Sequence, residues 1–261
     1  MKRIQKPEIK NKILWVVLFF MINSGEAFAA IPLITDDTGT QGKGNVQIEL
    51  FGEYGHDREG RVTTKNSDIS ATLTYGLIDT LDLAFISIPY QAWSSDGAGS
   101  LIKGDGLGDM AIEAKWRFYD EDGLSLALKP GLTIPTGNED KGLGAGKMTY
   151  YLNLIASKEL NPWAFHINLS YVRNDNKVDE RKDLWHASFA ATVDVIKNLK
   201  LVGDIGLATN PDSASTNPLA YILGGLIYSL RENLDIGLGL KGGLTKPEMD
   251  ISIRGGITWR F

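Results

Sequence analysis

Residues 249–261 read MDISIRGGITWRF and end the chain on an aromatic side chain. From Met249 to Phe261, every second residue is apolar or glycine, and the residues between them are polar, charged or glycine. A period of two indicates a β-strand whose two faces meet different surroundings. The apolar face ends in Trp259 and Phe261, which is typical of a transmembrane strand with one face toward lipid and the other toward a lumen.

The same alternation recurs through most of the chain. We therefore predict an all-β fold: a closed antiparallel up-and-down transmembrane β-barrel of about twelve strands. The expected strands lie near residues 46–54, 66–76, 81–93, 109–118, 124–134, 148–158, 163–171, 185–195, 199–207, 218–229, 234–241 and 249–261. Broken alternation at 85–89 predicts a bulge, and Pro130 predicts a local irregularity. Residues 218–229 are apolar on both faces, so their register stays open.

The links between these strands alternate in length. Short links follow the second, fourth, sixth, eighth and tenth strands, and longer polar links follow the third, fifth, seventh and ninth. Outer-membrane barrels show this asymmetry, with short periplasmic turns and longer extracellular loops. Aromatic residues near strand ends indicate two membrane-interface girdles. The interface aromatics predicted here include Trp93, Trp116, Trp163, Trp185, Trp259 and Phe261.

The first 29 residues are typical of a secretory signal peptide. A basic start is followed by an apolar run, Ile13 to Ile22, and by Ala27-Phe28-Ala29, which predicts cleavage near Ala29-Ala30. A retained membrane anchor is the alternative. Residues 30–43 lack a strand period, so we expect a periplasmic or plug segment, followed by the barrel at 44–261. The location expected is the outer membrane of a Gram-negative bacterium.

Composition narrows the function classes. The chain has no Cys, which excludes disulfides and thiolate metal sites. Removal of residues 1–29 takes away five Lys/Arg and two Asp/Glu, so the formal charge falls from −5 to −8. An acidic mature protein is a poor candidate for binding nucleic acid. Asp36 and Asp37 are a weak candidate for a calcium site, with turns as the alternative, and no cofactor is predicted.

The inward strand faces carry many charges of both signs. A dry interior would make these charges very costly, so they need water, mutual pairing, or both. A water-filled pore and a network that narrows the pore both satisfy this condition. The lumen-lining candidates are Glu49, Glu53, Asp68, Asp109, Glu113, Lys115, Arg117, Lys129, His166, His186, Asp194, Lys200, Asp204, Asp235, Lys241, Asp250, Arg254 and Arg260.

Catalysis is the weaker alternative. His166 with Asn168, Ser170 or Thr192 could mimic a Ser-His pair, and Glu49, Glu53 and Glu113 could supply an acid pair. His56 is expected in the first extracellular loop, and His186 is expected well away from His166 along the wall. Hydrogen-bonded lumen residues explain the same pattern. The glycine-rich stretches 94–105 and 136–147 are expected to be loops that gate the pore or fold inward.

Short motifs add a family resemblance. Residues 31–49, IPLITDDTGTQGKGNVQIE, and 104–115, GDGLGDMAIEAK, resemble the outer-membrane family named for the meta-pathway of phenol degradation, whose members are often called transporters. The C-terminal residues resemble the signal by which outer-membrane barrels are assembled. The resemblance implies a porin-like barrel involved in uptake of aromatic or other small organic compounds. It supplies no catalytic residues.

These observations predict a channel for passive passage of small solutes, with no enzymatic activity. Its expected partners are outer-membrane lipid, the solute, and the barrel-assembly machinery through the C-terminal strand. The first alternative is a closed barrel that acts as a structural or scaffolding partner of another envelope protein. The second is an outer-membrane hydrolase that uses His166.

Overall fold

The computed structural model describes residues 31–97 and 100–261, and the predicted signal peptide lies outside them. Thirteen strands are present in this part of the chain, together with one short 3-10 helix, η2 (Glu139–Lys141). The strands are β1 (Val46–Glu59), β2 (Val62–Ile78), β3 (Leu81–Gly97), β4 (Ser100–Leu107), β5 (Met110–Glu121), β6 (Leu124–Ile134), β7 (Thr149–Leu160), β8 (Trp163–Arg173), β9 (Asp183–Ile196), β10 (Leu199–Ala208), β11 (Leu219–Arg231), β12 (Leu234–Gly243) and β13 (Ile251–Arg260). Within this part of the chain, no helix is long and apolar enough to cross a membrane.

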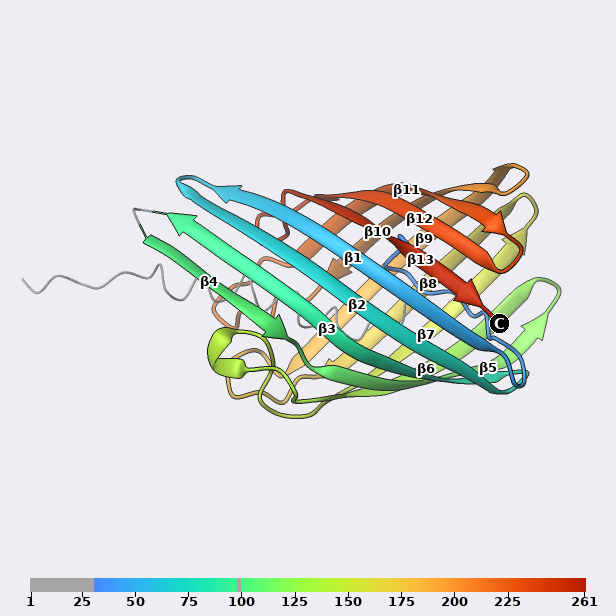
Figure 1. Ribbon diagram of the computed structural model, residues 1–261, viewed down its shortest axis with the longest axis horizontal. Helices are drawn as coiled ribbons and strands as arrows, with labels where there is room; N and C mark the ends of the chain where they lie inside the picture. The colour runs from blue at the N-terminus through green and yellow to red at the C-terminus, as the bar shows by residue number, and fades with distance from the viewer. Residues whose placement is uncertain (1–30, 98–99) are drawn as a thin grey trace, which may run out of the picture.

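Twelve of these strands close into a single antiparallel barrel. Each pairs with its neighbours, and β1 closes the ring by pairing with both β2 and β13. Strand β4 is an addition to the ring, because β3 pairs with β5 over Leu81–Ile86 and with β4 over Tyr90–Gly97. Figure 1 shows the inclined strands around the bore, and β4 extending beyond one end. The predicted fold class is confirmed.

The polarity of the barrel is inverted relative to a soluble protein. Along β13, Ile253 points outward and is 53% exposed, whereas its neighbour Arg254 points inward and is 2% exposed. Strand β1 matches this pattern, because Tyr54 lies opposite Ile253 and Glu53 lies opposite Arg254. An apolar outer wall with a polar inner wall is the arrangement that a barrel in lipid requires.

The two ends of the barrel differ as the link lengths predict. At one end, called the turn end here, two-residue links join the strands at 79–80, 122–123, 161–162, 197–198 and 232–233. At the other end, called the loop end, longer links span 135–148, 174–182, 209–218 and 244–250. The C-terminus lies at the turn end, where the backbone of Phe261 pairs with that of Val46.

The loop end also holds two errors of the sequence prediction. His56 lies within β1, opposite Lys65 of β2, because these strands run on to a two-residue turn at Gly60–Arg61. Residues 94–97 end β3 and residues 100–105 form most of β4, whereas the sequence predicts a loop here. Beyond the membrane a strand needs no apolar outer face, since backbone pairing alone extends it.

The irregular positions agree with the sequence expectations. The β2–β3 pairing shifts between Ile69 and Ala71, which meet Tyr90 and Ser87, so β3 carries the predicted bulge. The β5–β6 pairing is interrupted opposite Lys129 and Pro130 and shifts again between Arg117 and Tyr119. Proline has no N–H to donate to a neighbouring strand, which accounts for the interruption.

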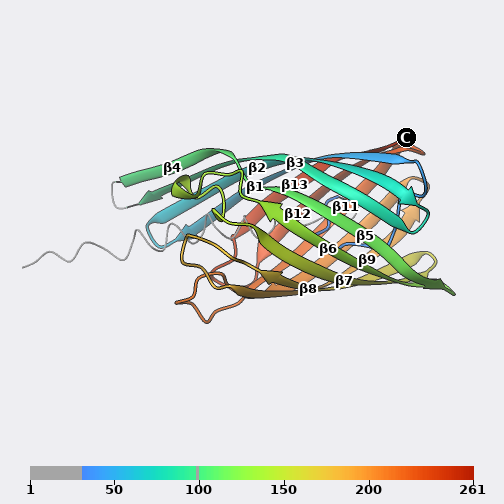
Figure 2. The same ribbon diagram turned by 90° about the horizontal axis from the view of Figure 1, so that it is seen from below.

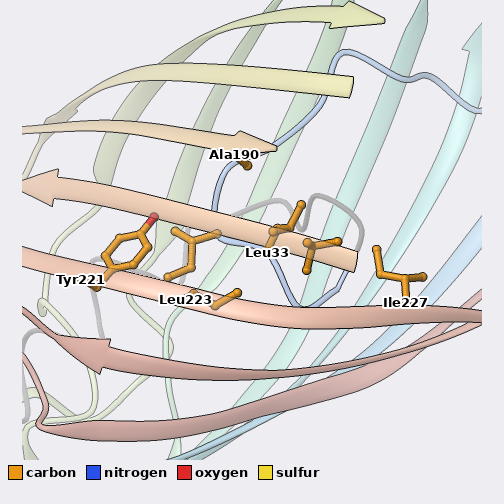
Figure 3. Close-up of a cluster of buried hydrophobic side chains, with 7 residues drawn as sticks. Leu33, Ala190, Tyr221, Leu223 and Ile227 are labelled. Carbon is orange, nitrogen blue, oxygen red and sulfur yellow. The ribbon is translucent and has the colours of Figure 1, made fainter. Parts of the chain in front are cut away.

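Strand β11 has a register that its apolar sequence did not reveal. Tyr221, Leu223 and Ile227 point inward and are buried, whereas Ile222, Leu226 and Tyr228 are exposed on the outer wall. An apolar inner face is unusual in this polar lumen and requires an apolar partner. That partner is the N-terminal segment, whose Leu33 and Ile34 belong to the same buried cluster (Figure 3).

Candidate functional site

Residues 31–43 run inside the barrel before β1 begins at the turn end (Figures 1 and 2). We call residues 31–41 the lumen segment. Ile31, Leu33, Ile34, Thr35 and Asp36 are all at most 5% exposed, because the barrel wall surrounds them. A chain without regular secondary structure leaves its N–H and C=O groups unpaired, so the wall must supply hydrogen-bond partners for burial to be tolerated.

Asp204 of β10 supplies the first set of partners. Its Oδ2 accepts hydrogen bonds from the backbone N–H of Ile34 and Thr35, at 2.7 and 2.8 Å. Its Oδ1 accepts from the Thr35 hydroxyl at 2.7 Å and from the Tyr221 hydroxyl at 3.1 Å. One wall carboxylate therefore satisfies two backbone donors of the lumen segment, and such charge-assisted bonds are stronger than neutral ones.

The lumen segment in turn provides a carboxylate, Asp36, to donors of the wall. Its two oxygens accept from Lys115 Nζ of β5 at 2.8 Å and from Lys129 Nζ of β6 at 2.7 Å. Lys129 also lies 3.8 Å from Glu113, whose other oxygen accepts from the Tyr151 hydroxyl at 2.7 Å. A buried ion group of this kind is stable only while all partners remain, since removing one leaves an uncompensated charge.

Polar side chains of β6 to β8 complete the attachment. Asn168 accepts from the Asp36 N–H and donates to the Asp36 carbonyl, both at 2.8 Å. The Thr38 N–H donates to Ser157 Oγ at 3.1 Å, and the hydroxyls of Thr38 and Ser125 contact each other. Because the partners come from both sides of the bore, the lumen segment crosses the passage rather than lining one wall.

Glycines on the inner wall make room for the start of the segment. A Cβ at Gly237 would lie 1.8 Å from the Ile31 carbonyl oxygen, and one at Gly239 or Gly225 would lie 2.8 Å from Pro32 Cγ. These distances are too short for any side chain. The wall is therefore shaped to fit the backbone of Ile31 and Pro32, and Arg254 Nε donates to the Pro32 carbonyl at 3.2 Å.

A second ion group lies beside Arg254, toward the loop end. Glu53 contacts Arg254 Nη1 at 2.8 Å and Lys241 Nζ at 3.1 Å. Lys241 also contacts Glu248 at 3.2 Å. Glu248 belongs to the loop between β12 and β13, so this loop folds inward and adds its carboxylate to the lumen. Met249 follows it inward and packs on Leu219.

The predicted lumen residues fall into three groups. Those inside the bore are Glu49, Glu53, Asp68, Asp109, Glu113, Lys115, Lys129, His166, His186, Asp204, Lys241 and Arg254; Asp68, Lys115 and His186 are partly exposed, and the others are buried. Those near the turn end, with more exposed side chains, are Arg117, Asp194, Lys200, Asp235 and Arg260. Asp250 lies outside β13 and accepts from the Arg58 N–H at the loop end, so its placement on the lumen wall is wrong. The strand begins at Ile251, two residues later than the alternation suggests.

Two cavities border the lumen segment. One of 580 Å³ is lined by Thr35, Asp37, Thr38, His166, Lys200 and Arg260, among others. Another of 250 Å³ is lined by Asp36, Gln41, Gln47, Glu49, Lys115 and Arg260. Charged and hydroxyl side chains line both, and Asp37, Gly39 and Arg260 border both cavities. Space for water and small solutes therefore exists in the turn-end half of the bore.

The histidines do not come together. His166 Nδ1 is hydrogen-bonded to Ser157 Oγ at 2.8 Å, its direct cross-strand neighbour, whereas Asn168, Ser170 and Thr192 had been expected as partners. His186 stacks on Tyr221, with ring centroids 6.4 Å apart. In the described part of the chain, no group of three His, Asp or Glu residues has a metal-binding arrangement. Asp36, half of the weak calcium candidate, instead pairs with two lysines.

The loop end is closed further by contacts between loops. Asp109 accepts from the N–H groups of Gly137 and Ala145, which holds residues 136–147 against the wall. In the next loop, Glu180 is buried and accepts from Asn174 Nδ2 at 2.8 Å. Burial raises the pKa of the Glu180 carboxyl to about 7, and the Asn174 hydrogen bond opposes this rise only in part.

The predicted interface aromatics are exposed, with one exception. Trp116, Trp163, Trp185, Trp259 and Phe261 are each between 46% and 55% exposed on the outer wall. Trp93 is half-buried, and its indole N–H donates to the Lys141 carbonyl at 3.1 Å. The loop that contains η2 covers Trp93, so a place in the outer girdle does not fit its surroundings.

Five residues that make contacts in the bore were not predicted from the sequence: Asp36, Tyr151, Ser157, Tyr221 and Glu248. Asp36 lies in a stretch without period, and Glu248 lies in a loop. Two signals were available for the lumen segment. One was the apolar inner face of β11. The other was the pair Gly237 and Gly239 at inward positions of β12, where the neighbouring inward residues Asp235 and Lys241 are charged.

Solved structures of low sequence identity share the fold. The COG4313 outer membrane channel from Pseudomonas putida F1 aligns with a TM-score of 0.69 at 18% identity, covering 86% of this chain and 98% of that one. The β domain of the Bordetella autotransporter BrkA gives 0.55 at 14%, covering 84% and 100%. The KdgM porin gives 0.53 at 8%, covering 82% and 99%. These similar structures are an outer membrane channel, the β domain of an autotransporter and a porin.

At the level of sequence, no curated protein matches the chain. A family model, in contrast, matches residues 34–261, which include nearly the whole lumen segment and every strand of the barrel. The match agrees with the resemblance carried by residues 31–49 and 104–115. The chain belongs to the family described as "Putative MetA-pathway of phenol degradation".

Proposed function

We propose that this protein is an outer-membrane channel for passive diffusion of small solutes, and that the lumen segment is a plug that must move for solutes to pass. One observation carries the proposal: a closed barrel with an apolar outer wall holds cavities of 580 and 250 Å³ beside a hydrogen-bonded segment. Charged and hydroxyl side chains line both cavities, so the bore has room for water and small solutes next to the segment.

The charges of the bore support a plug rather than an open pore. Arg254, Lys129 and Lys241 are at most 2% exposed, so water does not reach them in this conformation. Twelve strands give a bore wider than wall side chains alone can fill, and the lumen segment occupies the difference. Aromatic and other organic compounds are the solutes we propose, because the apolar cluster around Tyr221 offers them a surface once the segment leaves.

Single-channel conductance of refolded residues 30–261 in a planar bilayer tests the proposal. A cysteine pair, Thr38→Cys with Ser125→Cys, provides a lock, because the two hydroxyls touch and the chain has no other Cys. We expect discrete ohmic steps from the reduced protein and their loss on oxidation. Absence of conductance from folded, reduced protein, with folding checked by heat-shifted gel mobility, would refute the channel.

The same burial favours the second candidate, a closed barrel that supports another envelope protein. In that case oxidation and reduction of the cysteine pair leave conductance at zero. Enzymatic activity is not part of our proposal: substitution His166→Ala should leave conductance unchanged, whereas a hydrolase would lose its activity. Cleavage near Ala29-Ala30 and assembly through β13 complete the proposed route to the outer membrane, with the turn end in the periplasm.

A further inference from the structure

The lumen segment has an apolar part and an anionic part, which different walls hold. Leu33 and Ile34 pack in the buried cluster formed with wall residues of β9, β10 and β11 (Figure 3). The wall residues of this cluster are Ala190, Val202, Tyr221, Leu223 and Ile227. Two residues further along the chain, the Asp36 carboxylate reaches β5 and β6 on the other side of the bore.

The carboxylate of Asp36 contacts two ammonium groups at once. Its oxygens lie 2.8 Å from Lys115 Nζ and 2.7 Å from Lys129 Nζ, with side chains 14% and 2% exposed. Glu113 also lies within 4 Å of Lys129, at 3.8 Å, and it accepts from Tyr151 as well. Departure of Asp36 therefore removes a directly bonded carboxylate from both lysines.

We propose that this region is a binding site for small organic monocarboxylates, and that residues 33–36 occupy it as an internal substitute for the ligand. A chain spans at most about 3.3–3.6 Å per residue, so the three steps from Leu33 to Asp36 place the apolar side chains and the carboxylate within about 11 Å of each other along the backbone. A ligand with an aromatic ring or short alkyl chain and one carboxylate has that span. The inference rests on the proposed function, because the ligand gains access only when the segment moves.

The ligand and the segment then compete for the same wall. When the segment leaves, two buried ammonium groups lose a carboxylate partner, which is strongly unfavourable. An incoming carboxylate restores that partner, whereas a neutral compound of the same shape does not. A ligand that binds only the open state shifts the population toward it, so carboxylates would both pass through the barrel and promote its opening.

Calorimetric titration of the full mature protein, residues 30–261, tests the site with benzoate and its neutral counterpart, benzyl alcohol. Substitution Asp36→Asn removes the internal carboxylate, and we expect benzoate to bind this variant at least tenfold more tightly than it binds the unsubstituted protein. We also expect benzoate to bind the variant at least tenfold more tightly than benzyl alcohol does.

Adding Lys115→Gln or Lys129→Gln should reduce that preference to below threefold. Replacing Lys115 should disturb folding less than replacing Lys129, because the Lys115 side chain is the more exposed of the two. Lys158→Gln is the matched control, since Lys158 Nζ bonds the Asp122 carbonyl at the turn end, away from the segment. Equal binding of the two probes to Asp36→Asn, or a preference that survives loss of either lysine in folded protein, would overturn the site.

Conductance of Asp36→Asn separates this inference from the proposed function. If the variant conducts and the two probes bind equally, the carboxylate site is wrong and the channel stands. If benzoate binding depends on the lysines but the variant never conducts, the binding site stands and passage through the bore is wrong.

Discussion

The glycine at position 237 provides the sharpest test of the plug. Its absent side chain leaves room for the Ile31 carbonyl, and a Cβ there would lie 1.8 Å from that oxygen and 2.4 Å from the carbonyl carbon. Substitution Gly237→Val therefore expels Ile31 and Pro32 from the wall. Valine suits a strand, so the barrel itself should still form.

The expected loss follows from the contacts of these two residues. Burial of the Ile31 side chain contributes about 1.5–3 kcal/mol. The hydrogen bond from Arg254 to the Pro32 carbonyl, a bond from a charged donor, contributes about 1.5–3 kcal/mol. Losing both weakens attachment of the lumen segment by about 3–6 kcal/mol. At 1.4 kcal/mol per factor of ten, the open population rises by about 10²–10⁴.

Two measurements report this change. Hydrogen exchange of the Ile34 and Thr35 amides, which donate to Asp204, should lose protection by the same factor. Single-channel recordings should show longer open times. Gly224→Val is the matched control, because its Cβ would meet nothing within 4 Å. Unchanged exchange and unchanged open times in folded Gly237→Val protein would refute the reasoning.

Three further predictions concern other contacts. A disulfide between Thr38→Cys and Ser125→Cys should form in air and return the open times of Gly237→Val to those of the unsubstituted protein, as recordings before and after reduction will show. Arg254→Leu should lower the free energy of unfolding by about 3–5 kcal/mol, since Glu53 and the Pro32 carbonyl lose a partner; urea titration checks this against the control Arg231→Leu. Glu180 should make the loop 174–182 pH-dependent. Its folded pKa of about 7 exceeds the ordinary 4.5, so its stabilisation is complete below pH 4.5 and is lost as pH rises through 7. Hydrogen exchange should show the loop of the unsubstituted protein as protected as that of Glu180→Gln at pH 5 and less protected than it at pH 8.

The fold could be predicted because the alternation of apolar and polar residues in each wall strand indicates which face meets lipid and which meets the lumen. In β13, Ile253 and Arg254 reveal lipid and lumen from their chemistry alone, and the length of the links then reveals the two ends. Strand β4 was not predicted because it pairs with β3 beyond the membrane, where a strand does not need to alternate polar and apolar residues. Its glycines looked like a loop, although Gly104 has to be small beside the Trp93 indole.

The site was harder to predict, because its contacts join residues far apart in sequence. Asp204 accepts from Ile34 and Thr35 across about 170 residues. The residues next to Asp204 in β10 do not distinguish its role from that of Asp194 in β9, which pairs with Lys200 near the turn end. The lumen segment itself has no period, since its backbone bonds side chains of the wall rather than a neighbouring strand.

The two ion groups of the bore share a composition that predicts the ion preference of the open channel. Within direct contacts, one group has Lys115, Lys129, Glu113 and Asp36. The other has Lys241, Arg254, Glu53 and Glu248. In each, the wall provides two bases and one acid, and the second acid comes from a segment outside the wall strands.

Movement of either segment therefore leaves positive charge in the bore, and charged rings of one sign select ions of the other. We expect reversal potentials in a KCl gradient to shift toward chloride for Asp36→Asn and for Glu248→Gln. Asp212→Asn, which changes a loop carboxylate that caps the Ala214 N–H, should not shift them. A shift toward potassium in either lumen variant would mean that other acids, such as Glu49 and Asp68, control the field of the open bore.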